Sequence, residues 1–281
     1  MKRVIRAFVW ILILACLASA AGAERLDDSV LYTFYDNGAF FGDSITRSLA
    51  VRVADLRQKD ETFLDKTSFY ATGSITLFEG SRPVISGDGV SHCFNYRGTD
   101  ATMYYITTVT GAKKVFILLG MNDPIGIKIE KGLEWVEEIM YWMRRDQRTR
   151  DVEVYFLSVT PMGKAWCIER NRPDYQADLD EYNARLEEKC MEIGAGFIPI
   201  SEPLKGEDNH LNVAYSSDAK VHLNPDGLDV WLGCLRDYAQ KQYDLGLWDP
   251  FEPEETPTPE PTEEPGKDEQ PAAAETAGIK P

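Results

Sequence analysis

Three side chains could together activate a nucleophile. Ser44 follows a short apolar run, Ala39-Phe40-Phe41, and opens a segment with helical periodicity. A hydroxyl at such a position can attack an acyl carbon, but it needs a base at neutral pH. Of the three histidines, His222 lies in a loop just before a predicted helix. Asp218, four residues upstream, could orient that ring and stabilise its charged form.

The same chemistry needs donors for the oxyanion that forms at the attacked carbonyl. The candidates are the backbone N–H groups of Ser44 and Gly73 and the side-chain amide of Asn122. Each follows a predicted strand. The flanking residues that would support this site are Asp43, Gly120 and Asp123.

Each of these residues also has an ordinary structural interpretation. Ser44 alone is most simply a helix N-cap, and the glycines and the segment 122–124 could form plain turns. His222 could be a structural histidine. Their joint placement at the ends of predicted strands favours the catalytic interpretation.

The elements that must position these residues alternate along the chain. Apolar or β-rich segments predict five strands, at 39–41, 68–71, 115–119, 151–159 and 196–200. Apolar stripes at helical spacing predict helices between and after them, at 45–56, 133–143, 179–193 and 228–238. Residues 75–110 carry no clear pattern.

Strands separated by helices indicate a parallel sheet with right-handed crossovers and helices on both faces. We therefore predict an α/β fold, a three-layer α/β/α sandwich with about five strands. Ligands of such sheets bind beyond the carboxyl ends of the strands. Gly42, Gly73, Gly120 and the loop that follows residue 200 all reach that edge.

Three blocks resemble the motifs of the SGNH (GDSL) hydrolase superfamily, in the family's order. They are Gly42-Asp43-Ser44-Ile45-Thr46, Gly120-Met121-Asn122-Asp123, and the segment 218–222 followed by Leu223-Asn224-Pro225-Asp226-Gly227 and Trp231. The resemblance spans residues 39 to about 240. It implies a flavodoxin-like sheet, a Ser44-His222-Asp218 triad, and an oxyanion hole of Ser44, Gly73 and Asn122.

The sequence departs from the family pattern in two places. The family's acid stands three residues before the histidine, where this chain has Ala219, whereas Asp218 stands four before. The glycine block around Gly73 is faint. Motifs of other hydrolase and nucleotide-binding families, such as G-x-S-x-G, H-E-x-x-H and G-x-G-x-x-G, do not occur.

The two ends of the 281-residue chain differ from its middle. Residues 1–23 have a basic start, an apolar run and the small-residue site Ala21-Gly22-Ala23, which predicts a cleaved signal peptide. An uncleaved anchor and lipoprotein processing at Cys16 are the alternatives. The domain is expected at 24–250, and the Pro/Glu/Thr-rich residues 251–281 as a disordered acidic tail.

The charge limits the possible partners, and the cysteines leave the disulfide pattern open. A net charge of −16 argues against nucleic acid, and after signal cleavage we expect no stable membrane insertion. Four cysteines remain, Cys93, Cys167, Cys190 and Cys234. Disulfides and free thiols are equally consistent with their spacing. No cofactor and no metal are expected.

The resulting prediction is a secreted serine esterase that hydrolyses short-chain or acetyl esters through an acyl-enzyme. Its substrate would be a small-molecule or polysaccharide acyl ester. Two alternatives stay open. One is an extracellular carbohydrate O-acyltransferase on the same triad. The other is a non-catalytic carbohydrate- or wall-binding relative.

Overall fold

The structure is a computed structural model that describes residues 25–85, 87, 91–123 and 128–252. The chain divides into two units, Met1–Pro250 and Phe251–Pro281. The predicted signal peptide lies outside the described residues, as does the predicted tail apart from Phe251 and Glu252. The account below concerns the first unit.

Five strands form a parallel sheet in the order β2-β1-β5-β6-β7. They are β1 (Gly38–Gly42), β2 (Ser68–Ala71), β5 (Lys114–Leu118), β6 (Glu153–Leu157) and β7 (Gly196–Ile198). Each corresponds to a segment that the sequence predicts as a strand. The α/β prediction with about five parallel strands is therefore confirmed.

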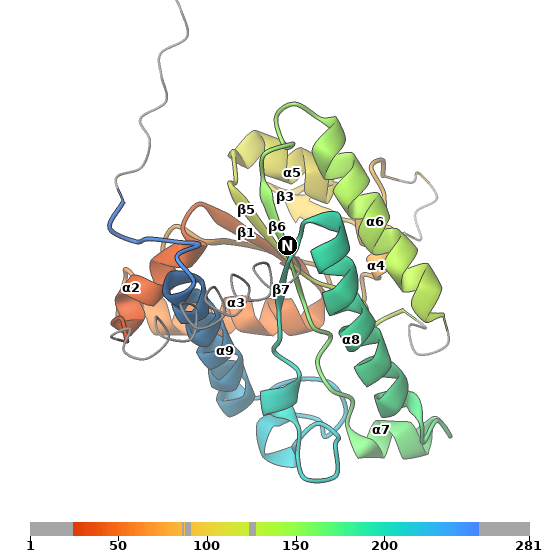
Figure 1. Cartoon of the computed structure of the whole chain (residues 1–281). Coiled ribbons are helices and arrows are strands. Elements are labelled where there is room, and N and C mark those ends of the chain that lie inside the picture. Colours follow the sequence, from red (N-terminus) through yellow and green to blue (C-terminus); the bar gives the residue numbers. More distant parts are fainter. Residues whose placement is uncertain (1–24, 86, 88–90, 124–127, 253–281) are drawn as a thin grey trace, which may run out of the picture. The chain divides into compact units, whose positions relative to one another are not determined.

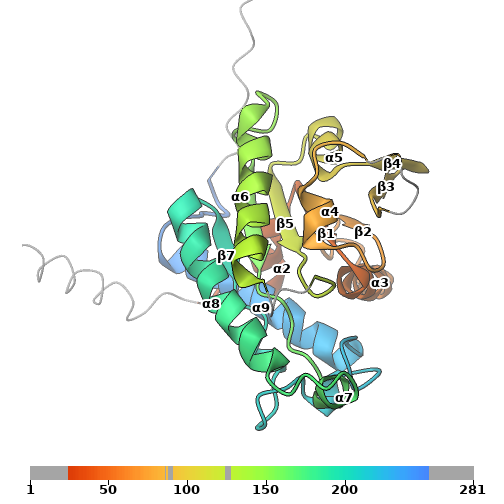
Figure 2. The same ribbon diagram turned by 90° about the vertical axis from the view of Figure 1, so that its right-hand side faces the viewer.

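Helices cover both faces of the sheet (Figures 1 and 2). One face packs against α4 (Leu77–Ser81), α5 (Met103–Thr110), α6 (Ile129–Arg145) and α8 (Tyr175–Ile193). The other packs against α2 (Asp28–Tyr32), α3 (Ser44–Arg57) and α9 (Pro225–Asp244). The short elements η1 (Thr33–Tyr35), α7 (Lys164–Glu169), η3 (Glu202–Leu204) and η4 (Val213–Tyr215) lie in the connections.

Alternation along β1 divides its side chains between the two cores. Phe41 joins the core beneath α6 and α8, whereas Phe40 joins the core beneath α3 and α9. On the Phe40 side, stacked rings cross four neighbouring strands in the order Phe69, Phe40, Phe116 and Tyr155, with ring centroids 4.6–5.2 Å apart. These rings are direct register partners. Cross-strand aromatic pairs of this kind stabilise the register that aligns the strand ends.

The chain order creates a switch point at the centre of the sheet. From β1 the chain moves outward to β2, then crosses back to β5 on the other side of β1. At such a point the connections leave the carboxyl ends of neighbouring strands in opposite directions and open a crevice. The residues after β1 and β5, Ser44 and Asn122, lie at this edge.

Residues 75–110, which the sequence left unassigned, contain α4, the antiparallel hairpin of β3 (Phe94–Tyr96) and β4 (Thr99–Ala101), and α5. The hairpin turns at Arg97 and Gly98, both with positive φ.

Cys93, Cys167, Cys190 and Cys234 are all free thiols. No helix in the described ranges is both long and apolar enough to cross a bilayer.

Candidate active site

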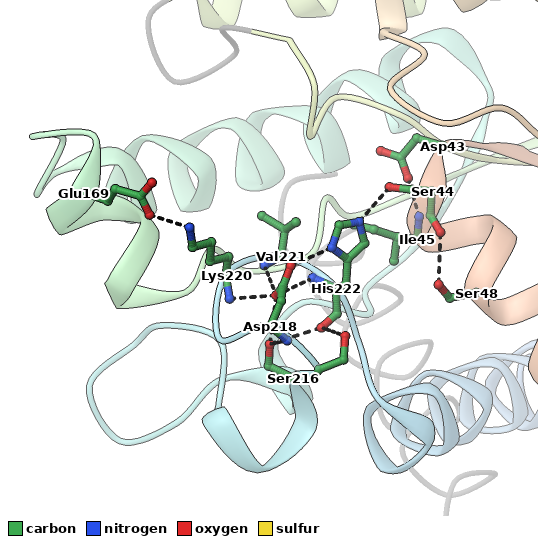
Figure 3. Close-up of polar contacts among 11 residues, drawn as sticks. Asp43, Ser44, Ile45, Ser48, Glu169, Ser216, Asp218, Lys220, Val221 and His222 are labelled. Carbon is green, nitrogen blue, oxygen red and sulfur yellow. Dashed lines mark hydrogen bonds and ion pairs between the residues drawn. The ribbon is translucent and has the colours of Figure 1, made fainter.

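Ser44 is the first residue of α3, directly after β1. The N-cap is Asp43, whose Oδ1 accepts a hydrogen bond from the Ile45 N–H at 2.9 Å. The interpretation of Ser44 as the cap is therefore wrong, because its neighbour fills that role. This leaves the Ser44 hydroxyl available, and its Oγ lies 3.1 Å from Nε2 of His222 (Figure 3).

The other ring nitrogen of His222 contacts the predicted acid. Asp218 Oδ2 lies 2.6 Å from His222 Nδ1, and Asp218 Oδ1 accepts hydrogen bonds from the backbone N–H groups of Lys220, Val221 and His222 at 2.8–3.1 Å. Partial burial raises the pKa of Asp218, but the bonds from the imidazole and the three N–H groups outweigh it and hold the pKa at about 2. The carboxylate is therefore charged at neutral pH.

The spacing of four residues between Asp218 and His222 is accommodated by the backbone at Ala219. Ala219 has φ of 56°, in the left-handed region. This turn folds the loop back on itself, so that one carboxylate reaches both the imidazole and the N–H groups of the next residues. The departure from the family spacing thus does not separate the acid from the histidine.

The loop that carries His222 is fixed by contacts that the sequence did not reveal. The Gly163 N–H, just before α7, donates to the Lys220 carbonyl oxygen at 2.6 Å. Lys220 Nζ forms an ion pair with Glu169 on α7 at 2.5 Å (Figure 3). Across the loop, the Ser217 N–H donates to the His222 carbonyl oxygen at 2.9 Å. An added Cβ at Gly163 would collide with the carbonyl group of Ala219, which explains the glycine there.

Two of the predicted oxyanion donors are backbone groups without a protein acceptor. Within the described part of the chain, nothing accepts a hydrogen bond from the N–H of Ser44 or from that of Gly73. Ser44 N–H is unpaired because it lies in the first turn of a helix. Gly73 follows β2, beside the strand that leads to Ser44.

Asn122, the third predicted donor, is exposed and follows β5, but its amide is already engaged. Its Nδ2 donates to Asp43 Oδ2 at 3.0 Å and to the Ile75 carbonyl oxygen at 3.2 Å. Both N–H groups therefore point at protein acceptors, and donation to an oxyanion would require one of these bonds to be released. Gly120, just upstream, has φ of 124°, which only glycine adopts without strain.

The two supporting aspartates are buried and hold neighbouring segments. Burial raises the pKa of Asp43 to about 6, against the opposing effects of its backbone hydrogen bonds and of nearby His222. Asp123 accepts hydrogen bonds from the backbone N–H groups of Leu77 at 2.6 Å and Phe78 at 3.3 Å, at the start of α4. Burial also raises its pKa. Asp43 and Asp123 thus tie the loops after β1 and β5 to their surroundings.

The other two histidines have other partners. His92 Nδ1 lies 3.1 Å from Glu79, and His210 Nδ1 lies 2.8 Å from the Asp208 carbonyl oxygen. Among the residues that the structure describes, no group of three His, Cys, Asp or Glu side chains is arranged to hold a metal ion.

Comparison with solved structures identifies the fold. The chain is similar to a GDSL-like lipase from Bacteroides thetaiotaomicron (16% identity, TM-score 0.53, covering 80% of this chain and 95% of that one). It is also similar to a Bacteroides fragilis protein classed as an acylhydrolase (16%, 0.54, 73% and 86%). A third similar structure is the periplasmic domain of a Salmonella ser. Paratyphi A lipopolysaccharide acetyltransferase (12%, 0.50, 72% and 83%). No family model and no curated protein matches the sequence.

These similarities and the strand order show which fold the chain has. The chain has the fold of the SGNH/GDSL hydrolases, as its three sequence motifs predict.

Proposed function

We propose that the protein is a serine ester hydrolase in which Ser44 is the nucleophile, His222 the base and Asp218 the acid. One observation supports this proposal more than any other. The Ser44 Oγ, the two nitrogens of His222 and the Asp218 carboxylate form a continuous hydrogen-bonded chain, with separations of 3.1 and 2.6 Å. A serine activated by an oriented imidazole is the arrangement that acyl transfer requires.

In the proposed mechanism, the Ser44 Oγ attacks the acyl carbon of the ester while His222 Nε2 takes its proton. The tetrahedral oxyanion faces the N–H groups of Ser44 and Gly73. The Asn122 amide joins them if it releases one of its present acceptors. Collapse of the intermediate breaks the ester bond, and His222 protonates the departing alcohol. Water, deprotonated by His222, then attacks the acyl-enzyme, and the acid leaves as Ser44 regains its proton.

The substrate is proposed to be a short-chain or acetyl ester, including those of polysaccharides, outside the cell. The predicted signal at residues 1–23 supports the location. The fold that this chain shares with a GDSL-like lipase supports ester chemistry. Acyl transfer to a sugar hydroxyl would use the same acyl-enzyme, with the sugar in place of water.

Hydrolysis of p-nitrophenyl acetate by the purified protein tests this proposal, with Ser44→Ala as the matched variant. We expect a saturable rate that the substitution removes. Equal background rates from the two folded proteins would contradict the hydrolase. Recovery of turnover only when a sugar acceptor is added would assign the protein as a transferase.

A further inference from the structure

An exposed cation lies one helical turn from the proposed nucleophile. Arg47 follows Ser44 by three residues on α3, so the two side chains project on neighbouring parts of one helix face. Its Nη2 lies 3.2 Å from the point where a Cβ on Gly73 would stand. The guanidinium therefore lies against the residue whose N–H is a proposed oxyanion donor.

The guanidinium of Arg47 has no anionic partner in the described parts of the chain. Arg52, further along α3, provides the contrast, because it is paired with Asp229 at 2.7 Å. In a protein with a net charge of −16, carboxylates are plentiful. An arginine left free of them at the edge of a site can bind an anion supplied by a ligand.

Arg47 also borders a hollow of about 250 Å³ between α3 and the start of α9. Val51 of α3 and Pro225 and Leu228 of α9 line it with apolar surface, and Arg52 and Asp55 lie at its polar side. Neither Ser44 nor His222 lines the hollow, but each lies three residues along the chain from a residue that does, Arg47 and Pro225 respectively. The hollow is open enough for the larger part of an ester, which is the alcohol when the acyl group is short.

We propose that Arg47 selects substrates whose alcohol part bears a carboxylate, such as esters on acidic sugars. The planar guanidinium presents paired donors that match a carboxylate in two parallel hydrogen bonds. One free guanidinium balances one negative charge, and Asp55 in the same hollow disfavours a doubly charged phosphate. This inference rests on the proposed function, and it assigns the substrate class of that site.

The test compares 3-acetoxybenzoate with its uncharged methyl ester, each rate being corrected for spontaneous hydrolysis. For each protein we take the ratio of kcat/KM for the anionic ester to kcat/KM for the neutral ester. We expect this ratio to be about tenfold larger in the wild type than in Arg47→Gln, which is the size typical of a hydrogen bond to a charged group. Arg47→Lys should restore part of the ratio. Lys59→Gln, which removes an exposed charge beyond the end of α3, should leave it unchanged.

An equal loss for both esters in Arg47→Gln would overturn the inference, because it would indicate a general role in catalysis or folding. A larger dependence on Arg47 for 3-acetoxyphenyl phosphate than for 3-acetoxybenzoate would also overturn the carboxylate assignment. The neutral ester alone reports the proposed function, since its hydrolysis must depend on Ser44 whatever Arg47 does.

Binding gives a readout that needs no turnover. The Ser44→Ala protein should bind 3-acetoxybenzoate more tightly than the methyl ester in a calorimetric titration. The added Arg47→Gln substitution should weaken only the binding of the anion, by about tenfold. Equal affinity for the two esters in Ser44→Ala would contradict the inference.

Discussion

The two halves of the site are held by different forces. Ser44 follows a fully buried strand and precedes Ile45, which is part of the core. His222 and Asp218 lie in a loop, with side chains that are 41% and 33% exposed, fixed by hydrogen bonds and an ion pair. Packing therefore positions the proposed nucleophile, whereas polar contacts position the proposed base and acid.

The same contrast appears in the two aspartates of the site. Burial raises the pKa of Asp43 to about 6. Partial burial would also raise the pKa of Asp218, but the hydrogen bonds it accepts lower it to about 2. Asp43 is thus buried in the core, where its charged form is disfavoured, whereas Asp218 is stabilised as an anion next to the imidazole. Only the second arrangement suits the role proposed for Asp218, which is to support a protonated His222.

The largest effect should follow from removing the proposed base, His222. His222→Ala should lower the rate of acylation by at least about 10³-fold, because the Ser44 hydroxyl would lose its proton acceptor. Stopped-flow measurement of p-nitrophenol release reports this rate. Near-normal acylation in a folded His222→Ala protein would contradict the division of the site into a packed nucleophile and a loop that supplies the base, since the loop would then contribute nothing to catalysis.

Substitution of the proposed acid, Asp218, should have a smaller effect, and two variants separate its contact with His222 from its contacts with the loop backbone. Asp218→Asn retains an oxygen for the backbone N–H groups but places an NH₂ group against His222 Nδ1, so we expect kcat to fall strongly, but by less than in His222→Ala. Asp218→Ala removes the loop contacts as well and should also lower the thermal midpoint. Equal kcat in Asp218→Asn and the wild type would assign the acid to another residue.

The buried half of the site, which is the end of β1 and the start of α3 with Ser44, can be perturbed through packing alone. An added Cβ at Gly42 would collide with the Thr46 side chain and lie 2.7 Å from the Leu118 carbonyl oxygen. Gly42→Ala should therefore lower the free energy of unfolding by about 1–3 kcal/mol, as measured in urea. Gly233→Ala, at an uncrowded position in α9, is the control and should not destabilise the protein. Equal stability of the two variants would contradict a tightly packed strand end.

The smallest effects concern pH. The native pKa of Asp43 lies above the usual 3.8, so its contribution to stability falls as pH rises from about 4 to about 6. The native pKa of Asp218 lies below 3.8, so its contribution is present above about pH 4 and is lost as pH falls towards 2. Carboxyl ¹³C NMR titration should give midpoints near these two values. A shared midpoint near 4 would remove the distinction between the halves.

The sequence predicted the buried half better than the exposed one, for a physical reason. Short continuous apolar runs such as 115–119 are typical of strands buried on both faces, and the positions of the strand ends follow from them. The short segments at 75–110 lack such runs, because the hairpin strands have three residues each and alternate with turns. The stacked rings from Phe69 to Tyr155 could not be foreseen either, since register depends on neighbours distant in the chain.

The motif residues indicated where the candidate site lies, but not its internal contacts. Asp43 as the N-cap had a signal, because aspartate is a preferred cap directly before a helix. The pairing of Lys220 with Glu169, and of Asn122 with Asp43, joins segments far apart in sequence. Nothing local predicts such pairs. The left-handed turn at Ala219 brings Asp218 into contact with His222, and it likewise could not be predicted from the number of residues between them.

Labelling with a fluorophosphonate tests the central claim most directly, because the reagent reacts with a serine only when a base activates it. Peptide mapping by mass spectrometry should place a single adduct on Ser44, with labelling strongly reduced in His222→Ala and absent in Ser44→Ala. An unlabelled wild-type protein, or an adduct on another serine that persists in Ser44→Ala, would contradict the account.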